Sequence, residues 1–249
     1  MKMIFALAFV SLFAMSNEQS VDNKPDVIKQ RVVLGVVEFP PLVMKDTTTL
    51  KCHGDIIDAI SALLTKLNYE VRVECAPPAR LFERLRAGVV DLTINVKGTR
   101  ALYDNVIFLD KPVVFLSTLL VSNKKRLNEK SVAAVRGYDF LGMRKELLEE
   151  GYTFFDMPNA SETIQLFEMH RTAHLLTYEA PYIFYVANNG STVSELLVSQ
   201  RRNIPSFLAV SKTSDQKDSL ITNLEQAMMD ISSYSILDFY KKNNFPIEN

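Results

Sequence analysis

Apolar runs of strand length alternate along this chain with segments whose apolar residues recur every three or four positions, and this alternation limits the folds open to it. The first run, residues 31–38, reads RVVLGVVE and is followed closely by Pro40 and Pro41, which cannot donate to a sheet ladder. A helical pattern then covers residues 55–68. Strands separated by helices predict an α/β protein whose sheet is mostly parallel and covered on both faces.

The alternation occurs in two sets. The first set continues with predicted strands at 70–75 and 89–95 and a short helix at 81–87. The second set has predicted strands at 132–135, 153–155 and 174–178 and helices at 142–150 and 161–170. Extended runs at 113–122 and 206–211 bracket the second set, and helices at 216–231 and 236–242 follow.

Two similar sets joined by two long extended runs predict two lobes with a pair of crossing strands as their hinge. We expect residues 31–118 and 208–249 to form the first lobe, the latter segment supplying its C-terminal helices, and residues 119–207 to form the second. A cleft between two lobes is where a small ligand usually binds.

Residues 1–16 have the layout of a cleaved secretory signal, with a basic start, an apolar run over residues 3–15 and a small residue at Ser16. An uncleaved anchor is the alternative, although a spanning helix needs roughly 20 apolar residues. We expect cleavage after Ser16, a flexible polar leader over residues 17–30, and a soluble product in the periplasm.

Composition and missing motifs narrow the function. Lys and Arg total 28 against 29 Asp and Glu, and the basic residues are dispersed, so we expect no nucleic-acid binding. The signatures G-x-S-x-G, G-x-G-x-x-G, H-E-x-x-H and the phosphate loop do not occur, so we expect no enzyme and no cofactor. Glu168, His170 and His174 resemble metal ligands, but a helix that ends near His170 separates them, so we expect no metal site.

The chain has two cysteines, Cys52 and Cys75. In an oxidising compartment such a pair is more often bridged than reactive. Cys52 comes just before the helical pattern at 55–68, and Cys75 ends the predicted strand at 70–75. In a strand-helix-strand unit the start of the helix and the end of the next strand lie at the same sheet edge, so we expect a Cys52–Cys75 disulfide. Two buried free thiols are the alternative.

Several short segments carry a resemblance to a known family. They are Phe39-Pro40-Pro41, Gly54-Asp55, LRAGVVD at 85–91, Gly98-Thr99-Arg100, and the segments 108–112, 132–137, 170–179 and 207–212. Each is weak alone, but their order over residues 31–245 resembles the family 3 extracellular solute-binding proteins, the polar amino-acid binders of bacterial ABC uptake systems. The resemblance implies a type II periplasmic-binding-protein fold, and a monomer that delivers a small molecule to an inner-membrane ABC permease.

The same resemblance implies a pair of charged ligand contacts, one from each lobe. Arg100 is expected to bind a ligand carboxylate, because its planar guanidinium donates two parallel hydrogen bonds. A surface or hinge salt bridge is the alternative for Arg100. Glu179, in the place of the family's Asp, is expected to meet a ligand amine. A ligand bridging the two would favour a closed state.

Further contacts follow from the resemblance. Phe39 is expected to form an apolar wall of the cleft, with core packing as the alternative. Asn95 is expected to hydrogen-bond the ligand from the end of its strand. Arg80 is a second candidate for a carboxylate, with a solvent-facing helix start as the alternative.

Tyr138 and Asp139 follow Gly137 at a turn where the family's backbone N–H groups and a hydroxyl meet a ligand carboxylate. A fixed negative charge at Asp139 would repel that carboxylate, so we expect Asp139 either to cap a helix or to bind a ligand amine.

Two other functions remain open on this fold. One is a periplasmic sensor that presents its ligand state to a membrane receptor. The other is a dehydratase-like enzyme that uses Glu179 or Asp139 as a general acid.

Overall fold

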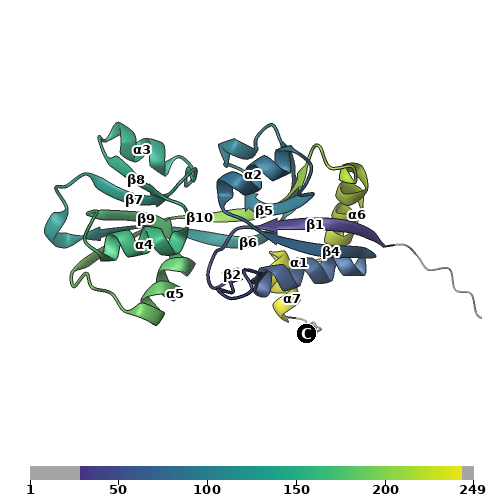
Figure 1. Cartoon of the computed structure of the whole chain (residues 1–249), viewed down its shortest axis with the longest axis horizontal. Helices are drawn as coiled ribbons and strands as arrows, with labels where there is room; N and C mark the ends of the chain where they lie inside the picture. The colour runs from purple at the N-terminus through teal and green to yellow at the C-terminus, as the bar shows by residue number, and fades with distance from the viewer. Residues whose placement is uncertain (1–28, 243–249) are drawn as a thin grey trace, which may run out of the picture.

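The protein has two groups of strands and helices joined by two long strands, as the computed structural model shows (Figure 1). It describes residues 29–242, without the side chains of residues 200–202. The expected signal at 1–16 and all but the last two residues of the expected leader at 17–30 therefore lie outside the described residues.

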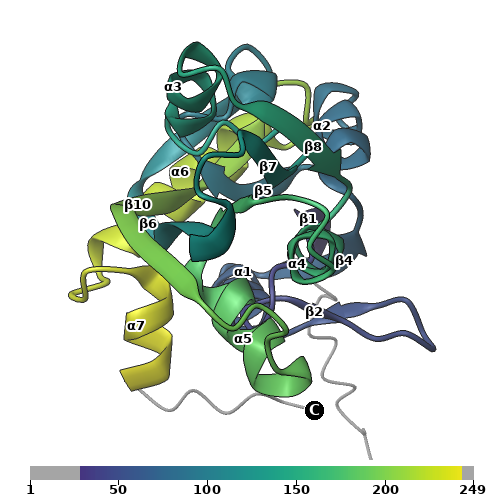
Figure 2. The ribbon, with the colours of Figure 1, turned by 90° about the vertical axis from the view of Figure 1, so that its left-hand side faces the viewer.

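Eight strands form one continuous sheet in the order β4-β1-β5-β10-β6-β9-β7-β8. Their bounds are β1 Gln30–Val36, β4 Tyr69–Cys75, β5 Leu92–Val96, β6 Val106–Asn123, β7 Ser131–Val135, β8 Thr153–Met157, β9 His174–Tyr178 and β10 Leu196–Ser211. A hairpin of β2 Met44–Lys45 and β3 Cys52–His53 forms a separate two-stranded sheet, and its loop extends away from the rest of the chain (Figure 2).

Strand directions confirm the predicted architecture. Within the first lobe β1 pairs in parallel with β4 and β5, and within the second β7 pairs in parallel with β8 and β9. The two long strands β6 and β10 pair with each other antiparallel along most of their length. These are the two crossing strands expected at 113–122 and 206–211, and each begins earlier than predicted.

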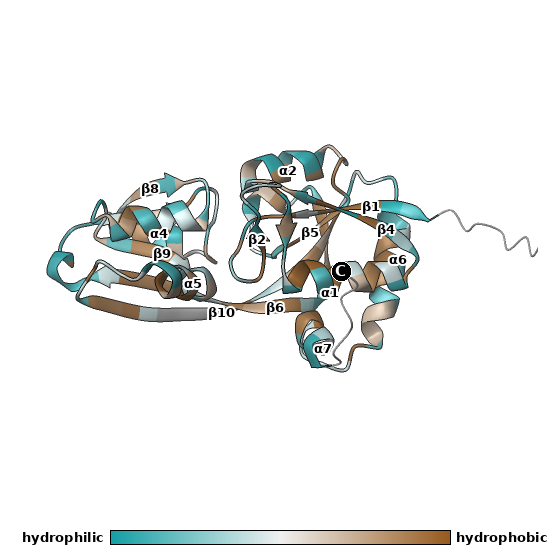
Figure 3. Cartoon of the chain, turned by 60° about the horizontal axis from the view of Figure 1, so that its bottom comes forward, coloured by the Kyte–Doolittle hydropathy of each residue, from teal (hydrophilic) through white to brown (hydrophobic). Residues whose placement is uncertain are grey.

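Between residues 29 and 242, four α-helices belong to the first lobe and three to the second. They are α1 Asp55–Lys66, α2 Pro78–Arg86, α6 Lys217–Met229 and α7 Ile236–Lys242, and then α3 Met143–Glu149, α4 Ala160–Glu168 and α5 Glu179–Asn189. Helix α1 follows the predicted spacing, since its residues Ile56, Ile60, Leu63 and Leu64 are all buried. The helices carry both polar and apolar colour in Figure 3. This is expected for helices that turn one face toward a sheet and the other toward solvent.

Each lobe has its own apolar core, and the change from one core to the other occurs within the crossing strands. On β6, Val114 packs with the core of the first lobe and Leu116 with that of the second. On β10, Ile204 belongs to the second lobe and Leu208 to the first. The division of the lobes at residues 118/119 and 207/208 stays a prediction.

Asp91, the last residue of the LRAGVVD segment at 85–91, has a structural role. Its side chain is buried, and Oδ2 accepts a hydrogen bond of 2.7 Å from the backbone N–H of Val33 while Oδ1 accepts one of 2.5 Å from Ser214. Gly88 has a φ of +70°, and a side chain there would meet the carbonyl oxygen of Thr213. The segment therefore ties β1 to the chain that follows β10.

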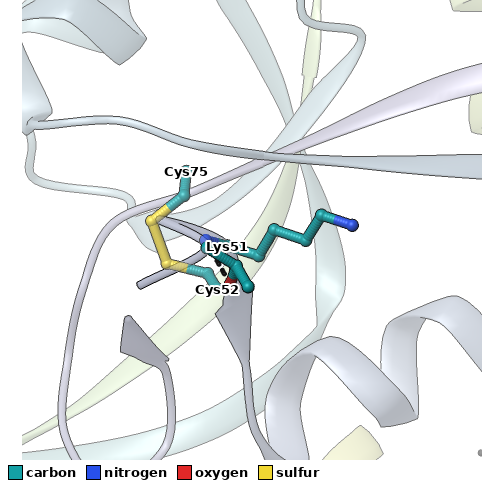
Figure 4. The surroundings of a disulfide bond; sticks show 4 residues. Lys51, Cys52 and Cys75 are labelled. Carbon is teal, nitrogen blue, oxygen red and sulfur yellow. Dashed lines mark hydrogen bonds between the residues drawn. A yellow bond between two sulfur atoms is a disulfide. The ribbon is translucent and has the colours of Figure 1, made fainter. Parts of the chain in front are cut away.

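The predicted disulfide is confirmed. Cys52 on β3 and Cys75 at the end of β4 are bridged, with their Cα atoms 5.6 Å apart (Figure 4). The bond fixes the small hairpin to the main sheet next to the start of α1.

The two histidines that resemble metal ligands in the sequence, His170 and His174, lie on separate segments. Helix α4 ends at Glu168, and His174 begins β9, so His170 and His174 do not share a helix face. Within residues 29–242 no group of three potential metal ligands gathers. In the same range no helix has the length and apolar character needed to cross a membrane.

Candidate functional site

A cavity of about 80 Å³ lies between the two lobes. The wall from the first lobe is aliphatic, built by residues of β1 and β5, of the hairpin region and of the start of α1. Its members are Val36, Val37, Val43, Ile56, Ile94 and Val96. Val114 and Leu116 close the base, where the crossing strand β6 passes between the lobes.

The opposite wall is aromatic. Phe39, which lies three residues after the end of β1, is 5.3 Å from Tyr178 between ring centroids. Tyr178 ends β9 and also contacts Phe140 at 5.3 Å and Tyr138 at 6.3 Å. Aromatic pairs at such separations attract one another beyond the burial of their area. The rings thus form one continuous surface that spans the two lobes.

Three polar side chains line the aliphatic side of the cavity. The Asn95 Oδ1 atom accepts hydrogen bonds from the Thr99 hydroxyl at 2.7 Å and from the Val96 N–H at 2.8 Å, and the Ser206 hydroxyl donates to the Val114 carbonyl. Among the described residues the Asn95 amide nitrogen makes no hydrogen bond. Asn95 therefore offers two N–H donors to a ligand.

Of the described side chains that line the cavity, Asp139 is the one that carries a charge. Its Oδ2 atom accepts a hydrogen bond of 2.9 Å from the backbone N–H of Gly142, the residue that precedes α3. Its Oδ1 atom has no hydrogen-bond partner and no ion-pair partner among the described side chains. The carboxylate thus closes the turn through one oxygen, and its residue is part of the cavity lining.

The turn that carries Asp139 has an unusual backbone. Phe140 and Leu141 have φ values of 52° and 53°, which are rare for residues with a side chain, and Gly142 follows at 87°. Such conformations persist where surrounding contacts enforce them, and they gather at ligand sites. Here Leu141 reaches across to the first lobe, because a Cβ added to Gly98 would lie 2.7 Å from its Cδ2 atom.

The side chain of Arg144 on α3 stabilises the turn that carries Asp139. Its guanidinium donates to the carbonyl oxygens of Tyr138 at 2.8 Å and Val135 at 2.9 Å, and it pairs with Asp156 at 2.7 Å. It also lies 4.4 Å over the ring of Phe154. With all its partners inside the second lobe, Arg144 acts as a positioning residue.

The electrostatics of the cavity follow from its lining. Burial raises the pKa of Tyr138. Burial also raises the pKa of Tyr178, and the charges of Tyr138 and Asp139 add to that shift. Both phenols therefore stay neutral at physiological pH. Neither hydroxyl makes a hydrogen bond among the described residues, and both remain available to a ligand. Within the described part of the chain, the lining contains no Lys, Arg or His.

The structure brings together four of the seven residues expected to bind a ligand. Phe39, Asn95, Tyr138 and Asp139 all line the cavity. Asp139 accepts a hydrogen bond from the N–H of Gly142, the residue before α3, and both roles expected of Asp139 stay predictions.

The other three expected contacts do not line this cavity. Arg80 and Arg100 are exposed on α2 and on the short 3-10 helix at Arg100–Leu102, and Glu179 is the half-buried first residue of α5. A second hollow of about 310 Å³ lies between α2 and the second lobe, but it is lined by Arg86 and Arg136 rather than by Arg80 or Arg100.

Three residues that line the cavity were not expected from the sequence: Tyr178, Phe140 and Leu141. A usable signal existed for Tyr178, because it ends a strand, and the carboxyl ends of parallel strands meet at one edge of a sheet. No comparable signal marks Phe140 and Leu141, whose places depend on an irregular turn.

The protein is similar to known proteins in its three-dimensional structure but not in its sequence. No protein-family model matches the chain, and no curated protein matches its sequence. An ancestral arginine-binding protein bound to arginine is similar in structure, with a TM-score of 0.70, 20% identity, and coverage of 86% of this chain and 98% of that one. The protein has the fold of the two-lobed periplasmic binding proteins.

Two other solved structures share the periplasmic binding protein fold. An amino acid ABC transporter substrate-binding protein from Streptococcus pneumoniae, bound to L-arginine, has a TM-score of 0.66 at 19% identity and covers 88% of this chain and 97% of its own. A histidine kinase sensor domain with similarity to periplasmic binding proteins has a TM-score of 0.67 at 14% identity, with coverage of 87% and 92%. The fold thus occurs in both transport and sensing proteins.

Proposed function

We propose that this protein is a periplasmic solute-binding protein that closes its lobes on a small molecule and delivers it to an ABC transporter in the inner membrane. The observation that carries the proposal is the cavity between the lobes, which has one wall from each. Solute-binding proteins work in this way, because a ligand that contacts both lobes favours the closed state.

The connection between the lobes supports a hinge. The lobes have separate cores, and the long strands β6 and β10 pass from one to the other. Rotation about these strands would open the cavity by separating Phe39 from Tyr178 and Gly98 from Leu141. The arrangement described here, with both contacts made, corresponds to the closed form.

Location forms part of the same proposal. The signal layout at residues 1–16 supports export. The Cys52–Cys75 bridge is typical of proteins that fold in an oxidising compartment such as the periplasm. We propose a monomer there, with an inner-membrane permease as its partner.

The ligand contacts in this proposal are Phe39, Asn95, Tyr138, Asp139 and Tyr178. We do not extend it to Arg80, Arg100 and Glu179, because none of them lines the cavity.

The test is retention of a compound from a filtered bacterial extract of small metabolites. The protein is mixed with the extract, separated on a sizing column and denatured, and the released compounds are identified by mass spectrometry. We expect one compound to be retained and to be lost from Tyr178→Ala, while Tyr234→Ala, at an 89% exposed position, keeps it. Retention of nothing above background, or equal retention by Tyr178→Ala, would contradict the proposal.

The second candidate is a sensor protein, which the similarity to a histidine kinase sensor domain favours. The two functions differ in the partner that recognises the closed form. Cross-linking of ligand-loaded protein in membranes distinguishes them: capture of a permease supports transport, and capture of a kinase or cyclase supports sensing.

The extract experiment also addresses an enzymatic role. A binding protein releases its compound chemically unchanged after long incubation, whereas a dehydratase-like enzyme on this fold would release a product.

A further inference from the structure

We infer that the ligand of this cavity is an amine with an apolar body and no carboxylate group. The inference rests on the proposed function, because it names the class of compound that the cleft binds. It departs from the amino-acid ligand that the sequence resemblance implies.

The charge of the lining carries the first step. Among the described residues that line the cavity, Asp139 is the one acidic side chain, and no Lys, Arg or His accompanies it. Asp139 is half-buried, and a charge that is partly removed from water favours a partner of opposite sign. A ligand carboxylate would find no cation here and would lie near a second negative charge. A ligand ammonium would pair with Asp139.

The hydrogen bonding of Asp139 carries the second step. The backbone N–H of Gly142, at the turn before α3, already donates to the Asp139 Oδ2 atom at 2.9 Å. The protein's own carboxylate thus uses the donor that a ligand carboxylate would need. The Oδ1 atom has no partner among the described residues, so it can accept from an ammonium group.

The aromatic wall carries the third step. A cation is attracted to the face of an aromatic ring within about 6 Å of its centroid, most strongly where water is excluded. Tyr138, Tyr178, Phe39 and Phe140 offer four rings next to Asp139. The two phenol groups are neutral and can donate or accept hydrogen bonds. They add no charge to the cavity, so its electrostatic potential is determined mainly by the negative charge of Asp139.

The aliphatic wall defines the rest of the ligand. Val36, Val37, Ile94 and Val96 present no hydrogen-bonding side chain, and the Thr99 and Ser206 hydroxyls on the same side already donate within the protein, so the ligand's body there is mainly hydrocarbon. The Asn95 amide can donate to a single polar atom at that end of the ligand. The chemical class is therefore a primary or substituted amine on an aliphatic or aromatic skeleton.

Matched pairs that differ by one carboxylate test the inference. Isothermal titration compares isoamylamine with leucine, phenethylamine with phenylalanine, and agmatine with arginine, on the full mature protein. We expect at least one amine to bind about 10- to 100-fold more tightly than its amino acid, the range that one charge-assisted pair provides. An amino acid that binds as tightly as its amine, or a panel in which no amine binds, would overturn the inference.

The variant Asp139→Asn isolates the charge. Its amide oxygen can still accept from the Gly142 N–H, so the turn keeps its hydrogen bond. We expect amine affinity to fall by about 10- to 100-fold while the melting temperature stays near that of the wild type. The control is Asp218→Asn on α6, a 92% exposed position, which should bind like the wild type. Unchanged amine affinity in Asp139→Asn would overturn the role of Asp139.

Failure of the inference and failure of the proposed function give different results. If amino acids bind between the lobes and amines do not, the solute-binding function stands and the inference is wrong. If neither series binds and the metabolite extract yields no retained compound, the proposed function itself is wrong.

Discussion

The rings of Phe39 and Tyr178 meet across the boundary between the two lobes, with their centroids 5.3 Å apart and their planes at 58°. Phe39 follows β1 of the first lobe, and Tyr178 ends β9 of the second. Both residues also line the cavity. A contact between the lobes is therefore also part of the cavity wall, and the proposed function implies that ligand binding and lobe closure are coupled through it.

This coupling predicts a measurable interaction energy between the two rings. Phe39→Ala and Tyr178→Ala should each weaken binding of the retained compound, and the double variant should weaken it by less than the product of the two effects. The pair itself should account for about 2- to 10-fold in affinity. Titration calorimetry on the four proteins measures this term. Independent effects of the two substitutions would show that the rings do not interact in the bound state.

A second prediction concerns the close approach of Gly98 to Leu141. A Cβ at Gly98 would lie 2.7 Å from the Leu141 Cδ2 atom, so Gly98→Val should hold the lobes apart. We expect ligand affinity to fall by about 5- to 100-fold, the cost of overpacking a close contact.

The compensating variant is Leu141→Ala in the Gly98→Val background. It removes about as much volume as valine adds, so it should restore much of the affinity. If Leu141→Ala gives no recovery, the two residues do not meet in the ligand-bound form.

The disulfide predicts a third outcome, on stability. The Cys52–Cys75 bridge closes a loop of 23 residues in the unfolded chain. Loop-closure entropy gives about 3 kcal/mol of stabilisation for a loop of this length. Cys52→Ala/Cys75→Ala should lose that amount in urea unfolding. Reductant should lower the stability of the wild type and leave the double variant unchanged. Equal sensitivity of both proteins to reductant would argue against the bridge.

The fourth prediction is a pH dependence from His174. Its Nε2 atom donates to the Glu129 carbonyl, its Nδ1 atom forms a hydrogen bond with the Ser122 hydroxyl, and the side chain is buried. Burial lowers the pKa of His174 below 6.5, although Glu129 opposes the shift. The unfolded chain therefore binds the proton more readily, and the free energy of unfolding should fall as pH drops through 6.5 toward the depressed value.

Urea unfolding at pH 7.5 and pH 5.5 measures this term, which is limited to about 1.4 kcal/mol at the lower pH. His174→Gln should lose less stability over that interval than the wild type. The matched control His170→Asn alters an exposed residue with a left-handed backbone that asparagine tolerates, and it should follow the wild type. Parallel curves for the wild type and His174→Gln would rule out the His174 contribution.

The sequence predicts the fold well because the alternation of strand-like apolar runs and helical patterns is repeated along the chain. Helix α7 begins and ends where the pattern at 236–242 places it. Helix α5 is missing from the prediction, since Pro181 near its start and a run of half-exposed aromatic residues hide its period. The long strands β6 and β10 are longer than predicted, because their pairing partners come from distant parts of the chain.

The site is only partly predictable. Phe39, Asn95 and Tyr138 lie at or beyond the ends of parallel strands β1, β5 and β7, and such ends gather at one edge in any fold of this kind. Arg100 was expected from a motif, but its position depends on the length of the turn after β5. That turn places Arg100 on the surface and Thr99 in the cavity.

Closure of the two lobes around a ligand is tested most directly by a distance between them. The two native cysteines are bridged to each other, so spin labels at Ala87→Cys, at the end of α2, and Glu149→Cys, at the end of α3, report on the lobes alone. Pulsed electron paramagnetic resonance then gives the distance distribution with and without the compound retained from the extract. We predict a broad or longer distribution for the free protein and a single shorter one with the compound bound. The same distribution in both states, with the compound bound, would contradict the account.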